Sequence, residues 1–460
     1  MALPTLHTGF VPFIATTFVW LVVSWLPAGA QSFPSATPAV TLNSNADTDR
    51  GNDRRPSLAG DGQGHWIAVW QSDENLDGAL GKDWDILFAV SEDNGQTWSR
   101  PAPITLRATN DRDHEHSPSI ATDSEGTWVA VWQGTDTVGT SLGPDADILW
   151  SRSTDTGRSW SHPTPIDRGA SGDTGLDLAP RVSVAGKTWI AVWESSEDRH
   201  GAGKDFDVMY SRSIDGGATW SRAAFLNNNA ADDVDTDRAP VVASDGEGGW
   251  LVVWESYDSL DGTIGRDWDL LYSFSRDDGA TWSVPRPANE RARHDRSLTD
   301  LAPRLAAAPD GECLLLWTSE LYAPAGSDRQ DWELRARPFD FKKGKWGAEE
   351  FIDASRARQP ALRGTGLVRA GPRWVATWVF GRKDHGGDAG VTFAVRPDRG
   401  GWTEVAGPIP EVSCLERTDD DVAVAGELGS TDWVACWSSR RRGGGPYGTD
   451  RDLFCTHQAR

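Results

Sequence analysis

The chain has few of the residues that usually build metal or redox centres. Among its 460 residues there are only four cysteines and two methionines. In an exported protein these cysteines could form up to two disulfides, with three possible connectivities, and their spacing does not fit a zinc site. The four are Cys313, Cys414, Cys436 and Cys455.

Basic residues are outnumbered. The chain has 45 lysines and arginines against 68 aspartates and glutamates, which leaves a formal net charge of −23. Such a surface repels phosphate backbones and anionic lipid headgroups. The composition therefore argues against nucleic acid and membrane surfaces as partners, and it favours cations and neutral or cation-bridged ligands.

Long hydrophobic runs are confined to the N-terminus. The apolar stretch from Phe13 to Leu26 is followed by small residues that end at Ala30. This pattern predicts a signal peptide over residues 1–30, with cleavage near Ala30 and a secreted or periplasmic mature domain over residues 31–460. Because the segment carries no lysine or arginine, an uncleaved N-terminal anchor is the alternative.

One tryptophan recurs every 59 to 63 residues. The recurrence indicates seven units, each with four short strands separated by turn residues. The strand that contains this tryptophan is apolar on both faces, so we expect it to be sandwiched between two layers. The recurring positions are Trp70, Trp132, Trp193, Trp254, Trp317, Trp378 and Trp437.

The seventh unit ends shortly after its third strand, and the N-terminus supplies a fourth. The segment at about 36–43 resembles the fourth-strand sequence that ends at Thr105. Pairing the two chain ends would close the ring and remove exposed edges. We therefore predict an all-β fold: one seven-bladed β-propeller of four-stranded antiparallel blades, closed by the N-terminal strand.

The turn between the third and fourth strands has a repeated pattern, Ser-x-Asp-x-Gly-x-Thr/Ser-Trp. It resembles the Asp-box, the bacterial neuraminidase (BNR) repeat, and the resemblance implies a sialidase-like propeller. In that family these hairpins are structural and lie on the face opposite the active site. The Asp-box aspartate and tryptophan pairs are Asp93 and Trp98, Asp155 and Trp160, Asp215 and Trp220, and Asp277 and Trp282.

Acidic residues recur in the connections expected on the other face. Pairs two residues apart, such as Asp83 and Asp85, precede the third strand and can act as two-carboxylate pincers. A second series stands three residues before the first-strand proline, and we predict that it rings the channel mouth and binds ligand. Two interpretations stay open, loop capping and cation binding. The second series is Asp53, Glu115, Asp177, Asp237 and Asp300.

Two further loop motifs are candidate sites. Alternating oxygen ligands at Asn45, Asp47 and Asp49 suit calcium, the one cofactor that the sequence suggests. The segment that contains His114 and His116 adds two imidazoles to a single blade, where they are either solvated or metal-bound.

Two functions compete. Near-identical blades favour a non-catalytic, monomeric module that binds a glycan or an extracytoplasmic protein. The alternative implied by the resemblance is an exo-α-sialidase (neuraminidase)-type glycoside hydrolase, which needs an arginine cluster and a tyrosine nucleophile activated by a glutamate. Its candidate residues are Arg54, Arg238, Arg304, Tyr257 and Glu255, with Arg181 near the same strand in another unit.

Overall fold

A computed structural model describes most of the chain after residue 38. The described residues are 39–46, 48, 50–105, 114–135, 142–143, 145–172, 174–199, 201–231, 234–294, 298–308, 310–321, 331–352, 363–381, 389–398, 400–406, 422–426, 432–439 and 451–457. Contacts divide the chain into Met1–Pro34 and Ser35–Arg460, and all described residues belong to the second unit.

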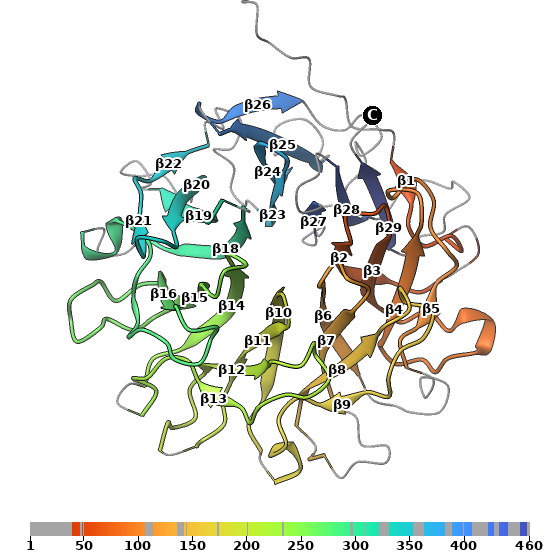
Figure 1. Ribbon diagram of the computed structural model, residues 1–460, viewed down its shortest axis with the longest axis horizontal. Coiled ribbons are helices and arrows are strands. Elements are labelled where there is room, and N and C mark those ends of the chain that lie inside the picture. The colour runs from red at the N-terminus through yellow and green to blue at the C-terminus, as the bar shows by residue number, and fades with distance from the viewer. Residues whose placement is uncertain are drawn as a thin grey trace, which may run out of the picture. The chain divides into compact units, whose positions relative to one another are not determined.

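Seven antiparallel sheets form a ring, which confirms the predicted seven-bladed β-propeller (Figure 1). Blade 1 is β2 (Asp53–Gly60), β3 (Trp66–Ser72), β4 (Asp85–Ser91) and β5 (Ala102–Pro103). Blade 2 is β6 (Glu115–Thr122), β7 (Trp128–Gly134), β8 (Asp147–Ser153) and β9 (Thr164–Pro165). Blade 3 is β10 (Asp177–Ala185), β11 (Thr188–Ser195), β12 (Asp207–Ser213) and β13 (Ala224–Phe225). Blade 4 is β14 (Asp237–Ser244), β15 (Trp250–Ser256), β16 (Asp269–Ser275) and β17 (Arg286–Pro287).

The remaining blades follow the same order. Blade 5 is β18 (Asp300–Ala307), β19 (Glu312–Leu321) and β20 (Asp331–Asp340), whose outer edge pairs with both β21 (Lys345–Trp346) and β22 (Glu350–Phe351). Blade 6 is β23 (Arg363–Ala370), β24 (Arg373–Gly381), β25 (Ala389–Pro397) and β26 (Thr403–Ala406). Blade 7 is β27 (Val422–Gly426), β28 (Trp433–Ser439), β29 (Asp452–His457) and β1 (Val40–Thr41).

Helix is almost absent from the part of the chain that the structure describes. It consists there of three short 3₁₀ turns, η1 (Leu76–Gly78), η2 (Ala170–Gly172) and η3 (Arg291–Arg293). None of the described helices has the length and apolar character needed to cross a membrane.

The ring closes through the N-terminal strand, as the sequence predicts. Val40 of β1 is the register partner of Cys455 in β29, and the Leu42 N–H donates to the Leu453 carbonyl at 2.9 Å. One disulfide joins Cys436 of β28 to Cys455. Cys313 is buried and not disulfide-bonded. Cys414 lies outside the described residues.

The second strand of each blade carries the repeated tryptophan and forms the core. Every residue of β3 is buried, and Trp66 and Trp70 are fully buried. They pack against Val434 and Leu453 of blade 7, and Ile67 faces blade 2. A buried tryptophan removes about 150–250 Å² from water, so burial between blades is the main force that holds the ring together.

The innermost strand of blades 1 to 5 contains a β-bulge just before its proline. The register shifts at this point, and the residue before the proline has a positive φ of 51–56°. Such a φ strains a non-glycine residue, and the bulge breaks the alternation of side chains along the strand. The five residues are Arg55, Ser117, Ala179, Ala239 and Ala302.

A side chain from the preceding blade holds the bulge in blades 2 to 5. The residue after the repeated tryptophan accepts the N–H of the bulged residue in the next blade. The bonds are Ser117 to Gln71 (3.0 Å), Ala179 to Gln133 (2.9 Å), Ala239 to Glu194 (2.7 Å) and Ala302 to Glu255 (2.8 Å). These bonds tie neighbouring blades together and offset part of the backbone strain.

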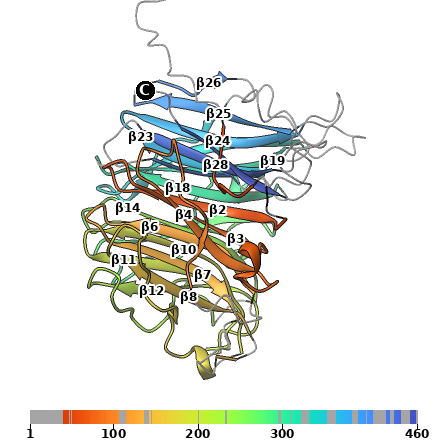
Figure 2. The same cartoon turned by 90° about the vertical axis from the view of Figure 1, so that its right-hand side faces the viewer.

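Strand register places the two kinds of connection on opposite faces of the ring. Trp66 pairs with Ser91 where the hairpin 91–98 begins, whereas Ser72 pairs with both Asp53 and Asp85 at the other end of blade 1. The strands run from one face to the other (Figure 2). We call these the hairpin face and the acidic face.

Candidate functional site

Each of the four repeated hairpins is built around its aspartate. In the first, Asp93 Oδ1 accepts from the Ser91 hydroxyl and from the Thr97 N–H, both at 2.8 Å, and Oδ2 accepts from the Thr97 hydroxyl at 2.7 Å. The other three hairpins repeat this set of bonds around Asp155, Asp215 and Asp277. The carboxylates are thus engaged inside the turns that they shape.

These bonds also change the acidity of the hairpin aspartates. Hydrogen bonds from the Thr281 side chain and backbone lower the pKa of Asp277 to about 2.

The hairpin tryptophans pack edge-on against the preceding blade: Trp160 on Phe88, Trp220 on Trp150 and Trp282 on Tyr210, with ring centroids 5.6–6.0 Å apart.

The acidic series before the first-strand prolines is buried on the acidic face. Asp53, Glu115 and Asp300 accept the indole N–H of the repeated tryptophan in their own blade at 2.8–3.0 Å. Asp177 and Asp237 are buried at the same position. Burial raises the pKa of Asp53 to about 8, against the opposing effect of bonds from Ser72 and Trp70. The donors in these bonds are tryptophan side chains, and both loop capping and ligand binding by the series stay predictions.

An asparagine that follows the fourth strand joins an acid of this series to a paired acid of the preceding blade, a contact that the sequence patterns did not predict. The amide of Asn227 donates to Asp207 (2.6 Å) and to Asp237 (3.0 Å), which lie in adjacent blades, and its Oδ1 accepts from the Val208 N–H. Asn289 and Asn43 make the corresponding bonds. The recurrence of asparagine after these three strands could have indicated the contact, but asparagine is common in turns, so its sequence position alone predicts only a turn.

The acidic pairs before the third strands are mostly buried as well. Asp83, Asp145 and Asp267 are 6–8% exposed, and the second members Asp85 and Asp269 are 0–2% exposed. Within the described residues there is no group of three or more histidine, cysteine or acidic side chains arranged to hold a metal ion.

The predicted calcium segment is only partly described. Asp47 and Asp49 lie outside the described residues. The backbone carbonyl of Asn45 accepts from the N–H and the hydroxyl of Thr48, at 2.8 and 3.0 Å. Calcium binding at this segment therefore stays a prediction.

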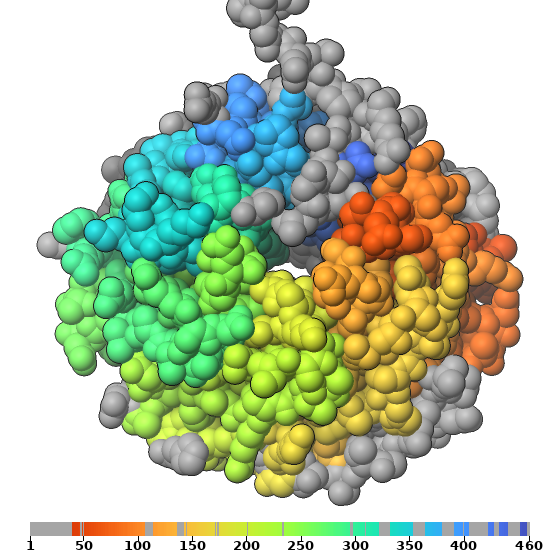
Figure 3. All heavy atoms as spheres, in the orientation of Figure 1, coloured from red at the N-terminus to blue at the C-terminus, as the bar shows by residue number. Residues whose placement is uncertain are grey.

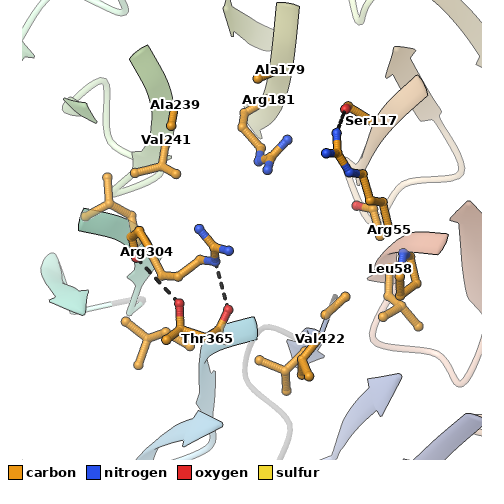
Figure 4. Close-up of a pocket in the computed structure, with 18 of the residues that line it drawn as sticks. Arg55, Leu58, Ser117, Ala179, Arg181, Ala239, Val241, Arg304, Thr365 and Val422 are labelled. Atoms are coloured by element: carbon orange, nitrogen blue, oxygen red, sulfur yellow. Dashed lines mark hydrogen bonds between the residues drawn. The ribbon is translucent and has the colours of Figure 1, made fainter. Parts of the chain in front are cut away.

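A cavity of about 550 Å³ lies on the axis of the ring, lined by the innermost strands (Figure 3). Three of the lining residues are arginines: Arg55 from blade 1, Arg181 from blade 3 and Arg304 from blade 5. Their side chains extend toward the same central space (Figure 4). The family resemblance implied Arg54 in this strand, but Arg55, the residue at the bulge, lines the cavity instead.

Neighbouring polar groups orient the three guanidinium groups. Arg304 Nε donates to the Thr365 carbonyl and its Nη1 to the Pro303 carbonyl, both at 2.8 Å. Arg181 Nη1 donates to the Pro180 carbonyl at 2.8 Å, and Arg55 donates to the Ser117 hydroxyl. These bonds orient the guanidinium groups, and the charge of Arg181 also interacts with the Glu194 carboxyl group.

Arg54 belongs to an aromatic cluster between blades 1 and 2. Its guanidinium lies 5.5 Å from the ring of Trp84, and Trp84 contacts His116, which stacks on His114. Burial, together with the nearby charges of His114 and Arg55, lowers the pKa of His116 to about 4. His116 of the predicted histidine pair thus lies close enough to Arg55 to feel its charge, and its lowered pKa keeps the His116 ring neutral at physiological pH.

Three sialidase candidates come together in blade 4. Arg238 Nε donates to Glu255 Oε2 at 2.8 Å, and its guanidinium lies 3.8 Å from the ring centre of Trp268. Tyr257 contacts the same tryptophan at 5.5 Å. Glu255 uses its other oxygen to accept the Ala302 N–H. Arg304, the remaining candidate, lies in the cavity.

Comparison with known proteins identifies the fold. No protein-family model and no curated protein sequence matches the chain. A protein of unknown function from Dyadobacter fermentans is 14% identical over 93% of this chain and 99% of its own, with a TM-score of 0.50. An ulvan lyase, a polysaccharide lyase, is 11% identical over 92% of this chain and 94% of its own, with a TM-score of 0.51.

A sialidase-type structure also appears among the matches. The leech intramolecular trans-sialidase is 13% identical over 92% of this chain and 70% of its own, with a TM-score of 0.43. Likenesses at these identities show the architecture alone. The chain is a seven-bladed β-propeller, and its architecture is similar to that of the ulvan lyase.

Proposed function

We propose that this protein is an exported, non-catalytic propeller that binds an acidic saccharide at its central cavity. The observation that carries the proposal is the placement of Arg55, Arg181 and Arg304 around one cavity in a chain with a net charge of −23. Arginine is the side chain best suited to pair with a carboxylate or sulfate group. A cluster of three at the axis therefore favours an anionic ligand locally, against the charge of the whole surface.

The choice of a saccharide rests on one structural neighbour and on the sequence pattern of the hairpins. The ulvan lyase of similar fold was determined with a fragment that contains glucuronic acid. We assign the repeated hairpins to the Asp-box on their sequence pattern, which also favours glycan-related propellers. The disulfide between Cys436 and Cys455 fits the oxidising environment of an exported protein.

Binding is favoured over hydrolysis by the contacts of the candidate nucleophile. A sialidase-type mechanism needs a glutamate that activates the tyrosine hydroxyl. Here both oxygens of Glu255 accept other donors, Arg238 and the Ala302 N–H, while Tyr257 lies against Trp268. Exo-α-sialidase activity remains the second candidate, because the three side chains are close together.

Calorimetric titration with glucuronate and N-acetylneuraminate, with glucose as the neutral control, tests the proposal. We expect the two acids to bind and glucose not to bind. Replacing Arg181 and Arg304 by alanine should weaken binding of the acids about tenfold or more, because each charged hydrogen bond contributes about 1.5–3 kcal/mol. Arg222→Ala, which removes an exposed arginine at the hairpin face, is the matched control. Equal binding of glucose, or full affinity in the double variant, would contradict the proposal.

A fluorogenic sialoside separates the two candidate functions. We expect no turnover by the native protein. Turnover that Tyr257→Phe abolishes would establish the hydrolase instead, because that variant keeps the ring and removes only the hydroxyl.

We also propose that calcium binds the segment that contains Asn45, Asp47 and Asp49. Calcium that binds only the folded state should raise its melting temperature, and a chelator should reverse the shift. No heat on titration with calcium, together with an unchanged melting temperature, would refute this.

A further inference from the structure

Two equivalent positions on the acidic face distinguish individual blades. The first position lies between the two paired acids that precede the third strand, as Trp84 lies between Asp83 and Asp85. The second position directly follows the acid at the start of the first strand, as Arg54 follows Asp53. In blades 1 to 5 they are Trp84 with Arg54, Ala146 with His116, Phe206 with Leu178, Trp268 with Arg238, and Trp332 with Leu301. Because blades 2, 3 and 5 fold without a combination of arginine and tryptophan, the fold does not require that pair.

In blade 4 the pair is open to solvent and held in place. The Arg238 guanidinium lies over Trp268 at 3.8 Å, Glu255 accepts its Nε–H, and 41% of the arginine side chain is exposed. A guanidinium that is already oriented loses little conformational entropy when it binds a ligand. In blade 1 the corresponding Trp84 is contacted by His116 as well as by Arg54.

An apolar surface adjoins this arginine. Tyr257 is 37% exposed and contacts Trp268. Its N–H donates to the Thr236 carbonyl at 3.1 Å, which joins it to the loop that contains Val234, a side chain 80% exposed. An aromatic ring that is exposed beside an oriented hydrogen-bond donor is a combination that marks ligand contacts.

One side chain, Glu255, joins this surface to the central cavity. Glu255, which orients Arg238, also lines the cavity, as does Arg304 of the next blade. A ligand held at the arginines can therefore extend over blade 4. A pyranose ring presents an apolar face of C–H groups and an edge of hydroxyls, which match Tyr257 and Arg238 respectively.

We infer that Tyr257, Trp268 and Arg238 form a second saccharide subsite, which takes a sugar ring adjoining the acidic sugar in the cavity. The inference rests on the proposed function and adds to it that the ligand is an oligosaccharide. Tyr257 contacts the ring face, Trp268 supports Tyr257 and Arg238, and Arg238 donates to the ring hydroxyls. The tyrosine acts here through its ring, so its hydroxyl is dispensable.

Chain length is the variable that tests the subsite. Titration would compare glucuronate with a glucuronate-containing tetrasaccharide, using the native protein and the variants Tyr257→Ala, Tyr257→Phe and Ile214→Ala. Ile214 is exposed on the hairpin face and gives a control of similar apolar character. We expect the native protein to bind the tetrasaccharide about tenfold more tightly than glucuronate. Tyr257→Ala should remove this preference and leave glucuronate binding unchanged, whereas the other two variants should retain it.

The outcomes separate the subsite from the cavity. If glucuronate binds through the cavity arginines and the tetrasaccharide binds no better, or if Tyr257→Ala keeps the preference, the subsite is wrong and the proposed function stands. If neither glucuronate nor the tetrasaccharide binds the native protein, the proposed function is wrong, and the subsite proposal is then wrong as well. Circular dichroism and melting temperature would show that Tyr257→Ala is folded, and Trp268→Phe gives a second, conservative variant expected to weaken only the tetrasaccharide.

Discussion

Replacing Asn43 by alanine should open the ring at its closure. Asn43 is fully buried, and its amide donates to Asp53 in blade 1 at 2.8 Å and to Asp452 in blade 7 at 3.0 Å. Its Oδ1 accepts the Leu453 N–H at 3.2 Å. In the variant, the carboxyl groups of Asp53 and Asp452 and the N–H of Leu453 lose their bonds to the Asn43 side chain. We expect this loss to lower the free energy of unfolding by about 3–5 kcal/mol.

Asn227→Ala is the matched control, because Asn227 makes the same bonds where the chain runs continuously from blade 3 to blade 4. Both variants should lose similar stability in denaturant titrations. Only Asn43→Ala should speed hydrogen exchange in both 40–46 and 451–457, because β1 has no covalent link to its neighbouring strand. A loss below about 1 kcal/mol, or unchanged exchange in these segments, would refute the reasoning.

The cost of Asn43→Ala should also depend on pH. The pKa of Asp53 rises from an ordinary value of 3.8 to about 8 in the folded protein, so the folded state binds the additional proton between these values. Stability therefore falls as pH rises through this range. Loss of the Asn43 donor raises this pKa further, so the variant should be penalised more at pH 9 than at pH 5. An equal penalty at the two values would contradict the assignment.

Three further predictions concern other parts of the ring. Gly157→Ala should cost about 2 kcal/mol more than Gly62→Ala in thermal unfolding, because both glycines have positive φ but only the first would place its Cβ against a side chain of blade 1, at 2.7 Å. Arg55→Ala should raise the pKa of His116 above about 4, because the arginine charge is one of the causes that lower it, and NMR titration of the native protein and the variant would measure the change. Asp277→Asn should be less stable than the native protein near neutral pH, and the gap should close as pH falls from about 4 to about 2, since the carboxylate has a depressed pKa in the fold.

The sequence alone determined the architecture. The repeat of Trp70 and its equivalents predicted seven blades, and the position of the last unit predicted closure by the N-terminal strand, which β1 and β29 confirm. These features could be predicted because strand burial and turn chemistry depend on residues close together in the chain, and because the same solution recurs in each blade.

The tertiary structure decided which side chains meet. Arg55 rather than Arg54, the arginine that the family resemblance implied, lies in the cavity, because the bulge adds a residue and breaks the alternation of side chains along the strand. The pairing of Cys436 with Cys455 and the bonds of Asn43 to residues at both ends of the chain were equally open from the sequence. Such contacts join different strands and blades, so they are specified by the closed ring and not by local sequence.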